Sequence, residues 1–326
     1  MTRSVNHSTV AMTTLALVAV WPPLTAGAQT TTTRQESCVP SRFGPADQTG
    51  NLHYVTPAKT LAATRLVTRG KAYRLGIETN KRTPAYPPRT FAITVVQPGQ
   101  PLGAPIGPTR TTYNDDIITG WVGIGSQIDG LGHLGIDNVY FNCNKAADFV
   151  TVEGLKKLGI ETVPPIATRA ILLDMVGYFG SDPVKEGTPF NRAEIEGAMK
   201  RQRIPSIEKG DVVLFHTGWA KLIGKDDKRY GAGEPGVGVG GASYLASRGV
   251  AMVGADTWGL EVIPAEKDSG VFEGHQILLA RNGIYILENM DTAEMVKDGA
   301  WQSLFTLGPP RVTGAVQAII NPIAIK

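Results

Sequence analysis

The sequence predicts a single α/β protein with a mixed sheet. Short apolar segments rich in β-branched residues outnumber the helical segments, and the two kinds are interspersed in the second half of the chain. The chain has 326 residues, which one large α/β domain can reach, and it contains no internal repeat. Hydrophobic residues make up 42% and charged residues 19%, which is typical of a globular protein and argues against disorder.

The elements follow from hydrophobic patterning and cap residues. Strands are predicted at residues 91–96, within the glycine-containing stretch 117–128, and at 170–175, 212–217, 251–254, 284–287 and 312–325. Helices are predicted at residues 151–158 with Thr151 as N-cap, 192–202 after Asn191, and 241–248. Residues 275–280 fit either a helix or a strand.

The N-terminus has the pattern of an export signal. Arg3 is followed by a mostly apolar run at residues 11–21, two prolines, and the small-x-small pattern of residues 26–28. The run is too short to span a bilayer, so we predict a signal peptide at residues 1–28, a flexible tail at 29–37 and a mature domain at 38–326. A periplasmic or secreted protein without a stable membrane span would result. The alternative is a buried N-terminal helix.

The two cysteines and the overall charge bear on disulfide pairing and on the kinds of partner the protein could bind. An exported protein could pair Cys38 with Cys143, but sequence spacing leaves a disulfide and two free thiols both open. The formal net charge is only +3, and Lys and Arg are scattered rather than clustered. We therefore expect no nucleic-acid partner.

The densest group of polar side chains lies at residues 125–133. Gln127 and Asp129 are two residues apart, so on a strand they point to the same face, and His133 follows after a glycine-containing turn. An amide, a carboxylate and an imidazole near one point suit Mn²⁺ or Zn²⁺. The alternative, which composition alone favours, is an exposed glycine-rich loop with an Asp turn.

Later residues offer further candidates. Glu288 ends an apolar strand, where an ionised carboxylate needs a partner, and His275 precedes it by thirteen positions, so the two could complete a metal shell. The alternative is a core histidine with a strand-terminal glutamate. Asp256 and Trp258 follow another apolar strand, and polar residues at that end of a strand often line a cleft. An Asp–Thr turn explains Asp256 equally well.

Taken in order, these segments resemble the cyclase superfamily, which includes kynurenine formamidase and isatin hydrolase. The resemblance covers nearly all of the mature chain and rests on residues 42–51, the central segment, residues 168–174, 210–219, 254–257 and 275–289. It implies a swivelling β/β/α-type domain with a mixed sheet or small barrel flanked by helices. It also implies homo-oligomers.

The central segment is similar to the family signature HxGTHxDxPxH but departs from it. Gly123 and Gln127 stand where the signature has its first two histidines, and Leu131 replaces its proline. Asp129 and His133 are kept. In relatives with two metal ions, the two missing histidines hold one of them. The resemblance therefore implies one divalent ion, Mn²⁺ or Zn²⁺, held by Asp129, His275 and Glu288 with Gln127 as a neutral oxygen ligand.

The resemblance also implies a reaction. It predicts hydrolysis of an amide, lactam or ester of a small substrate, aromatic ones included, with His133 as general base beside Asp129. His216, Trp258 and Asp256 would contact the substrate. Two alternatives differ in kind: a metal-free lyase or cyclising enzyme that uses His133 and Asp129 as acid and base, and a non-catalytic periplasmic binding protein built on the same scaffold.

Overall fold

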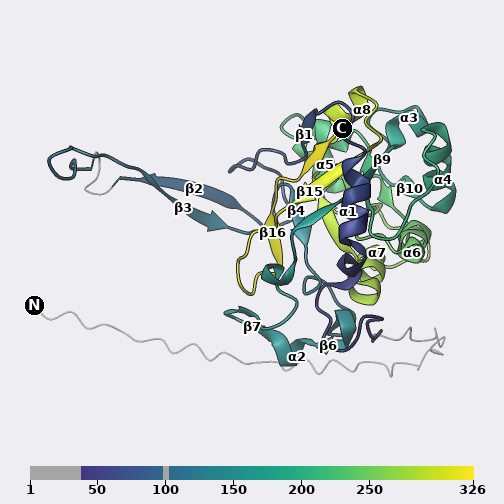
Figure 1. Cartoon of the computed structure of the whole chain (residues 1–326), viewed down its shortest axis with the longest axis horizontal. Helices are drawn as coiled ribbons and strands as arrows, with labels where there is room; N and C mark the ends of the chain where they lie inside the picture. The colour runs from purple at the N-terminus through teal and green to yellow at the C-terminus, as the bar shows by residue number, and fades with distance from the viewer. Residues whose placement is uncertain (1–37, 98–102) are drawn as a thin grey trace, which may run out of the picture. The chain divides into compact units, whose positions relative to one another are not determined.

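The computed structural model describes residues 38–97 and 103–326. Within this part of the chain one mixed sheet of nine strands forms the centre of the protein (Figure 1), so the predicted α/β class is confirmed. The predicted signal peptide at 1–28 and tail at 29–37 lie outside the described residues. In sheet order the strands are β1 (Ala72–Arg74), β17 (Ile323–Ile325), β15 (Gln302–Leu307), β9 (Ile166–Asp174), β11 (Val212–His216), β13 (Met252–Ala255), β14 (Tyr285–Glu288), β4 (Gln127–Asp129) and β16 (Gln317–Ile319).

The centre of the sheet is parallel and both ends are antiparallel. Strands β9, β11, β13 and β14 run parallel to one another, whereas β4 pairs antiparallel with both β14 and β16. Residues 212–216 are all buried. This is expected for a parallel strand that is covered on both faces, which reads as a continuous apolar run rather than an alternating one.

Helices and short sheets surround the central sheet. The helices are α1 (Pro57–Thr64), α2 (Ala146–Phe149), α3 (Met175–Phe179), α4 (Arg192–Arg201), α5 (Asp227–Ala232), α6 (Val239–Arg248), α7 (Glu273–His275) and α8 (Ala293–Lys297). The predicted α4 and α6 are confirmed. Helix α4 begins with a capping box, in which the Glu194 side chain accepts a hydrogen bond from the backbone N–H of Asn191. The other paired strands are β2 (Phe91–Val96) with β3 (Asp115–Gly120), β5 (Val139–Tyr140) with β6 (Asn144–Lys145), β7 (Val150–Thr151) with β8 (Gly154–Leu155), and β10 (Pro189–Phe190) with β12 (Gly236–Val237).

One predicted helix is wrong and one ambiguous segment is resolved. Residues 151–158 contain the β7–β8 hairpin, because Gly154 turns the chain at a φ of +130° and the Thr151 hydroxyl donates a hydrogen bond to the Gly154 carbonyl at 2.7 Å. Residues 275–280 are helical. Helix α7 continues into a π-helical turn at Gln276–Arg281, and such turns occur frequently at functional sites.

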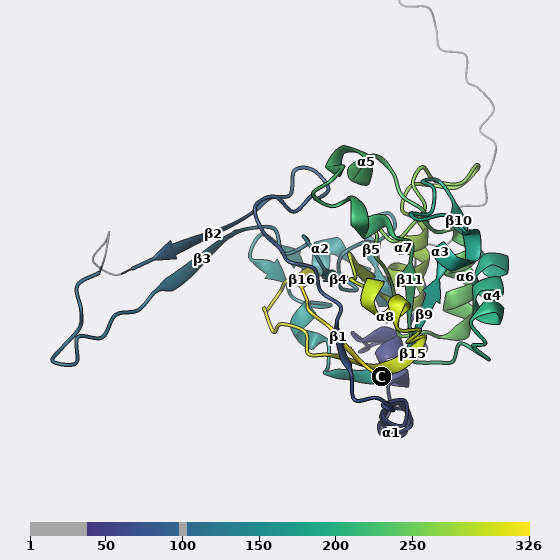
Figure 2. The same ribbon diagram turned by 90° about the horizontal axis from the view of Figure 1, so that it is seen from above.

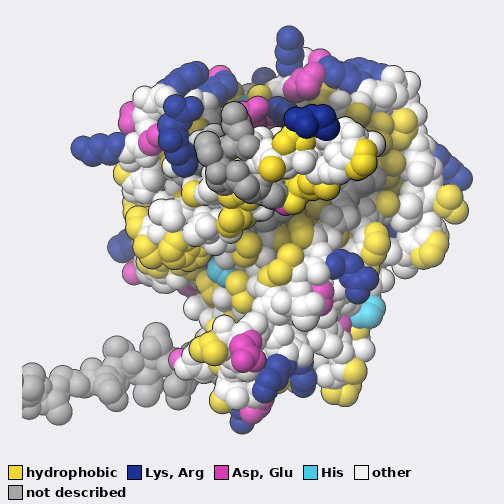
Figure 3. Space-filling view, turned by 90° about the vertical axis from the view of Figure 1, so that its left-hand side faces the viewer, with side chains coloured by type: hydrophobic (Ala, Val, Ile, Leu, Met, Phe, Trp, Pro, Cys, Tyr) yellow, Lys and Arg dark blue, Asp and Glu magenta, His cyan; other side chains and the backbone are white. Residues whose placement is uncertain are grey.

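Strands β2 and β3 form an arm that extends away from the central sheet (Figures 1 and 2). In their antiparallel register Ile93 lies opposite Ile118, with Val95 on the same face, and all three are more than half exposed. Hydrophobic side chains gather on this side of the molecule (Figure 3). The arm begins just after Arg89, so its base lies beside the cavity described below.

A disulfide joins Cys38 to Cys143, which settles the alternative that the spacing had left open. It ties the first described residue to the 3₁₀ helix Phe141–Cys143. In the part of the chain that the structure describes, no helix has the length and apolar character needed to cross a membrane.

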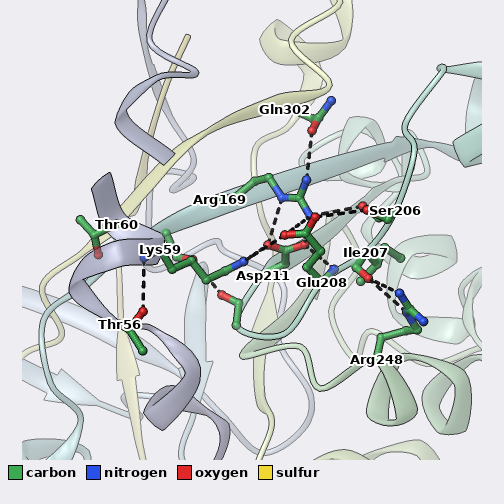
Figure 4. Close-up of polar contacts among 12 residues, drawn as sticks. Thr56, Lys59, Thr60, Arg169, Ser206, Ile207, Glu208, Asp211, Arg248 and Gln302 are labelled. Carbon is green, nitrogen blue, oxygen red and sulfur yellow. Dashed lines mark hydrogen bonds and ion pairs between the residues drawn. The ribbon is translucent and has the colours of Figure 1, made fainter. Parts of the chain in front are cut away.

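An ion network attaches α1 to the central sheet (Figure 4). The fully buried Asp211 carboxylate accepts hydrogen bonds from Arg169 of β9 at 2.6 and 3.0 Å, and Lys59 of α1 lies 2.7 Å from it. The backbone N–H of Glu208 donates a further bond at 2.8 Å. Each oxygen of this buried carboxylate is therefore paired within the protein.

Candidate metal centre

The register of three strands builds the site. Strand β4 lies between β14 and β16, and Gln127 lies directly opposite Glu288 while Asp129 lies directly opposite Gln317. Directly opposed residues of an antiparallel pair share a face of the sheet, so these four polar side chains project to the same side. All four are buried.

Three of the predicted ligands converge on one point. One ligand atom from each of Asp129, His275 and Glu288 lies within 4.8 Å of the others. The Nε2 atom of His275 is 3.6 Å from Oδ2 of Asp129 and 3.6 Å from Oε1 of Glu288. The structure therefore brings together residues that are up to 159 positions apart, as the resemblance implied.

The second oxygen of each carboxylate is occupied by a glutamine amide. The Nε2 group of Gln317 donates a hydrogen bond to Oδ1 of Asp129 at 2.7 Å, and Nε2 of Gln127 donates to Oε2 of Glu288. Oδ2 of Asp129 has no hydrogen-bond partner among the described residues, although Asp129 is fully buried. A buried carboxylate oxygen without a partner is costly, and it is the feature a bound cation would satisfy.

His275 is held by a carboxylate that faces away from the convergence point. Glu261 accepts hydrogen bonds from the backbone N–H groups of Gly274 and His275, and it also pairs with Nδ1 of the His275 ring. This fixes the ring so that Nε2 points at Asp129 and Glu288. Metal-binding histidines almost always have such a partner on their other ring nitrogen.

The pKa shifts of the three converging residues reflect the closeness of two carboxylates, Asp129 and Glu288, to a single imidazole. Burial and the charge on Asp129 raise the pKa of Glu288 to about 7. Burial alone would lower the pKa of His275, but its contacts with Asp129, Glu261 and Glu288 raise that pKa well above the usual range. Burial opposes ionisation of Asp129 too, yet His133, His275 and the Gln317 bond lower the pKa of this carboxyl.

The donor set fits a divalent ion. Two carboxylate oxygens and one imidazole nitrogen are ligands that Zn²⁺ and Mn²⁺ both accept, and three protein ligands with an open position are typical of a catalytic site. Oε1 of Gln127 is also buried without a partner among the described residues. The neutral ligand role of Gln127 stays a prediction.

His133 lies beside this group. Its Nε2 atom is 3.9 Å from Oδ2 of Asp129, and its backbone N–H closes a turn onto Gly130 at 3.0 Å. Burial, which outweighs the attraction of Asp129, lowers the pKa of His133. A neutral imidazole at this position can accept a proton.

A pocket opens onto the group from the side of the arm. Its lining residues are Tyr86, Arg89, His133, Leu134, Trp258, Gly259, Phe272, His275 and Glu288. The rings of Tyr86 and Trp258 lie 5.7 Å apart, and those of Phe272 and His275 lie 5.2 Å apart. Arg89 is the cationic residue of the lining, and its Nη1 donates to the Gly123 carbonyl at 2.8 Å.

Trp258 therefore lies where the sequence placed it, whereas two other predicted contacts do not. Nδ1 of His216 lies 2.8 Å from the Thr292 hydroxyl and 3.3 Å from Asp256. Asp256 accepts bonds from the backbone N–H and the hydroxyl of Thr217 at 2.7 and 2.6 Å, and from the Gly218 N–H. Neither His216 nor Asp256 belongs to the lining that the described residues form. Both stabilise the loop after β11.

Among the site residues that sequence reasoning missed are Gln317, Glu261, Tyr86 and Arg89. Gln317 lies in a segment that shows only β character, and Glu261 lies in a loop three residues after Trp258. The one available signal was Glu261, an acidic residue close to the predicted cleft. The other three are placed by strand pairing or by the path of the arm, which periodicity does not reveal.

Comparison with known proteins identifies the class. The model of the cyclase family matches residues 49–262, more than half of the chain, and the protein therefore belongs to this family. This confirms the resemblance noted in the sequence. Among curated proteins, none matches the chain.

Solved structures with the same fold include a crystal structure of a novel cyclase. That structure is 28% identical, with a TM-score of 0.79, and the match covers 88% of this chain and 98% of that one. Isatin hydrolase A from Ralstonia solanacearum matches at 16% identity and a TM-score of 0.60 over 82% and 97% of the two chains. An isatin hydrolase bound to the product analogue thioisatinate matches at 16% identity and a TM-score of 0.59. That match covers 82% of this chain and 98% of the other. The predicted fold is thus confirmed.

Proposed function

We propose that this protein is a metal-dependent hydrolase that cleaves an amide, lactam or ester bond of a small aromatic substrate. The observation that carries the proposal is the buried group of Asp129, His275 and Glu288 beside an aromatic pocket, with one Asp129 oxygen that no described residue satisfies. The kinship of the fold with isatin hydrolases adds support.

The proposed ligands are Asp129, His275 and Glu288. A divalent ion held there, Mn²⁺ or Zn²⁺, lowers the pKa of a water molecule and polarises the substrate carbonyl. Glu261 keeps the His275 ring oriented, and the two glutamine amides keep one oxygen of each carboxylate directed toward the ligand position. The site is thereby arranged before substrate arrives.

His133 carries the proton transfers in this proposal. It lines the pocket next to Asp129, so a water molecule attacking the substrate carbonyl can give its proton to the His133 ring. The same ring then returns the proton to the nitrogen or oxygen atom that leaves. Asp129 lies close enough to stabilise the charged ring between the two steps.

The pocket lining accounts for the substrate class. Tyr86, Trp258 and Phe272 supply flat apolar surface on which an aromatic ring can stack. Arg89 at the base of the arm offers a charged donor for a carbonyl or carboxylate of the substrate. A small aromatic formamide, lactam or ester combines these features.

Export of the protein is part of the proposal. The Cys38–Cys143 disulfide supports it, because disulfides persist in oxidising compartments and are rare in a reducing cytosol. The signal segment at residues 1–28 would direct the chain to the periplasm or the medium. Assembly into homo-oligomers stays a prediction of the family resemblance.

The test is an activity screen of the purified protein against aromatic formamides, lactams and small esters. It is run after treatment with a chelator and again after Mn²⁺ or Zn²⁺ is added back. We expect activity only with metal, and its loss in His133→Ala. His53→Ala is the matched control, because His53 is half exposed and pairs with Asp47 outside the pocket lining.

Three outcomes would contradict the proposal. Activity that survives the chelator unchanged would favour the metal-free lyase or cyclising enzyme. Tight ligand binding without turnover or metal would favour the binding protein. A His133→Ala variant with full activity would remove His133 from the mechanism.

A further inference from the structure

The side chain of Gln317 fills the space beside Gly123. A Cβ atom at position 123 would lie 2.3 Å from Oε1 of Gln317 and 2.8 Å from its Nε2, much closer than real contacts allow. Gly123 is not among the glycines with a left-handed backbone, so its φ angle does not call for a glycine. A side chain at position 123 would therefore force the end of the Gln317 side chain to move.

Gln317 uses that space to reach Asp129. It lies directly opposite Asp129 in the β4–β16 register, is only 6% exposed, and donates its hydrogen bond to Oδ1 at 2.7 Å. The oxygen that receives this N–H faces a proton donor and cannot face a cation at the same lone pair. Oδ2 has no hydrogen-bond partner among the described residues, so it is the oxygen that is open to an ion.

Gln127 donates a similar hydrogen bond to Glu288, which lies on β14, the other strand next to β4. Its Nε2 group donates to Oε2, while Oε1 of Glu288 faces His275 at 3.6 Å. Each carboxylate thus keeps one oxygen directed to the common point and one bonded to a neutral amide. A second ion would have to share these two oxygens with the amide N–H donors, and Gly123 and Gln127 offer it no imidazole.

We propose that Gln317 is a positioning residue that directs Oδ2 of Asp129 to the ion, and that Gly123, Gln127 and Gln317 together restrict the site to a single ion. The proposal rests on the proposed function, because it presumes an ion at Asp129, His275 and Glu288. It assigns a role to a residue outside the family signature. It also explains why a side chain at position 123 would displace Gln317 from Asp129.

The test is a double-mutant cycle read by calorimetric titration of the full mature chain with Zn²⁺ and with Mn²⁺. We expect one ion per wild-type chain. Gln317→Ala should weaken binding by about 10- to 100-fold, the usual effect of removing a partner that orients a ligand. Gly123→Ala should also weaken binding, because its methyl group displaces the Gln317 side chain.

The double variant gives the sharpest result. With Gln317 already removed, the methyl group of Gly123→Ala has nothing to displace, so the double variant should bind no more weakly than Gln317→Ala alone. Gln317→Met fills the same space without an N–H donor and should lose the same affinity. Gln302→Ala is the matched control. Its side chain belongs to the Arg169 cluster of Figure 4, and its metal affinity should equal that of the wild type.

Several outcomes would overturn this inference. Two ions per wild-type chain, wild-type affinity in both Gln317→Met and Gln317→Ala, or fully additive losses in the cycle would each do so. Thermal unfolding without metal identifies any variant that fails to fold, and Gln317→Met then carries the test. A wild-type protein that binds no ion contradicts the proposed function as well, whereas one ion with unaffected variants contradicts this inference alone.

Discussion

Two buried aspartates of this protein have opposite surroundings. Asp211 and Asp129 are both fully buried. Asp211 is bonded to Arg169 and to Lys59, and each of its oxygens has a partner (Figure 4). Asp129 has a neutral amide on one oxygen. Its other oxygen has no hydrogen-bond partner among the described residues, and histidine nitrogens lie 3.6 and 3.9 Å from it.

The difference separates a carboxylate that is satisfied within the chain from a candidate metal ligand. A buried charge is tolerated when a counter-charge and hydrogen bonds accompany it, and Asp211 has both within the chain. Asp129 lies near a second carboxylate, Glu288, and its basic neighbours are histidine rings and not an arginine or a lysine. A group that is left short of positive charge in this way is a candidate binding site for a metal ion.

Glu234 shows a third way to bury a carboxylate. It is fully buried, and its oxygens accept the backbone N–H groups of Trp258 at 2.8 Å and Gly259 at 2.9 Å. Burial, followed by the charge of Glu288, raises the pKa of Glu234 well above its usual range. Burial therefore disfavours the ionised form of Glu234, and the same side chain holds the Trp258 loop at the pocket.

The largest expected effect is a loss of activity when a candidate metal ligand is removed. His275→Ala should lower the metal-dependent kcat about a thousandfold or more, because an ion contributes several kcal/mol of transition-state stabilisation. The measurement is steady-state kinetics on any substrate found in the screen. His53→Ala, a histidine change outside the pocket lining, should keep wild-type kinetics. Equal losses in both variants would contradict the ligand role.

The next largest effect tests directly whether the two aspartates differ in their contribution to stability. Asp211→Asn should destabilise the fold by about 3 kcal/mol, because Arg169 and Lys59 are then left largely buried without their partner. Asp129→Asn in metal-free protein should cost only about 1 kcal/mol, because the His275 ring keeps its contacts with Glu261 and Glu288 when the Asp129 charge is removed. Urea unfolding of the two variants measures both. Equal destabilisation would show that the two sites are alike.

Metal should stabilise the fold through one site only. At a concentration one hundred times its Kd, Zn²⁺ or Mn²⁺ should raise the free energy of unfolding by about 2.7 kcal/mol, because it binds the folded state. The shift in Tm should disappear in Asp129→Asn and persist in Asp211→Asn. A shift retained in Asp129→Asn would place the ion elsewhere.

The smallest expected effect is on the pH dependence of stability, and it tests the raised pKa of Glu234. A raised pKa means that the folded protein keeps a proton which the unfolded chain releases above about pH 4.3, so stability falls as pH rises above that value. The slope from this group is at most about 1.4 kcal/mol per pH unit. Glu234→Gln cannot titrate, so the decline in its free energy of unfolding between pH 5 and 8 should be shallower than in wild type. Parallel curves would show that Glu234 is ionised.

Local signals in the sequence predicted much of the fold. The Asn191 and Glu194 pair marks the start of α4 because capping depends on residues three positions apart. Apolar runs such as 212–217 predict buried strands for the same local reason. The hairpin at 150–155 was misread as a helix, because the conformation of Gly154 and the strand pairing outweighed the apparent N-cap at Thr151.

The sequence by itself determined the α/β class and the family, and it named Asp129, His133, His275 and Glu288 as candidate site residues. Only the tertiary structure decided how they meet. Strand register placed Gln317 against Asp129 and Gln127 against Glu288, and Glu261 came from a loop to orient His275. These contacts depend on pairing between segments up to 188 positions apart, and no local pattern encodes such a register.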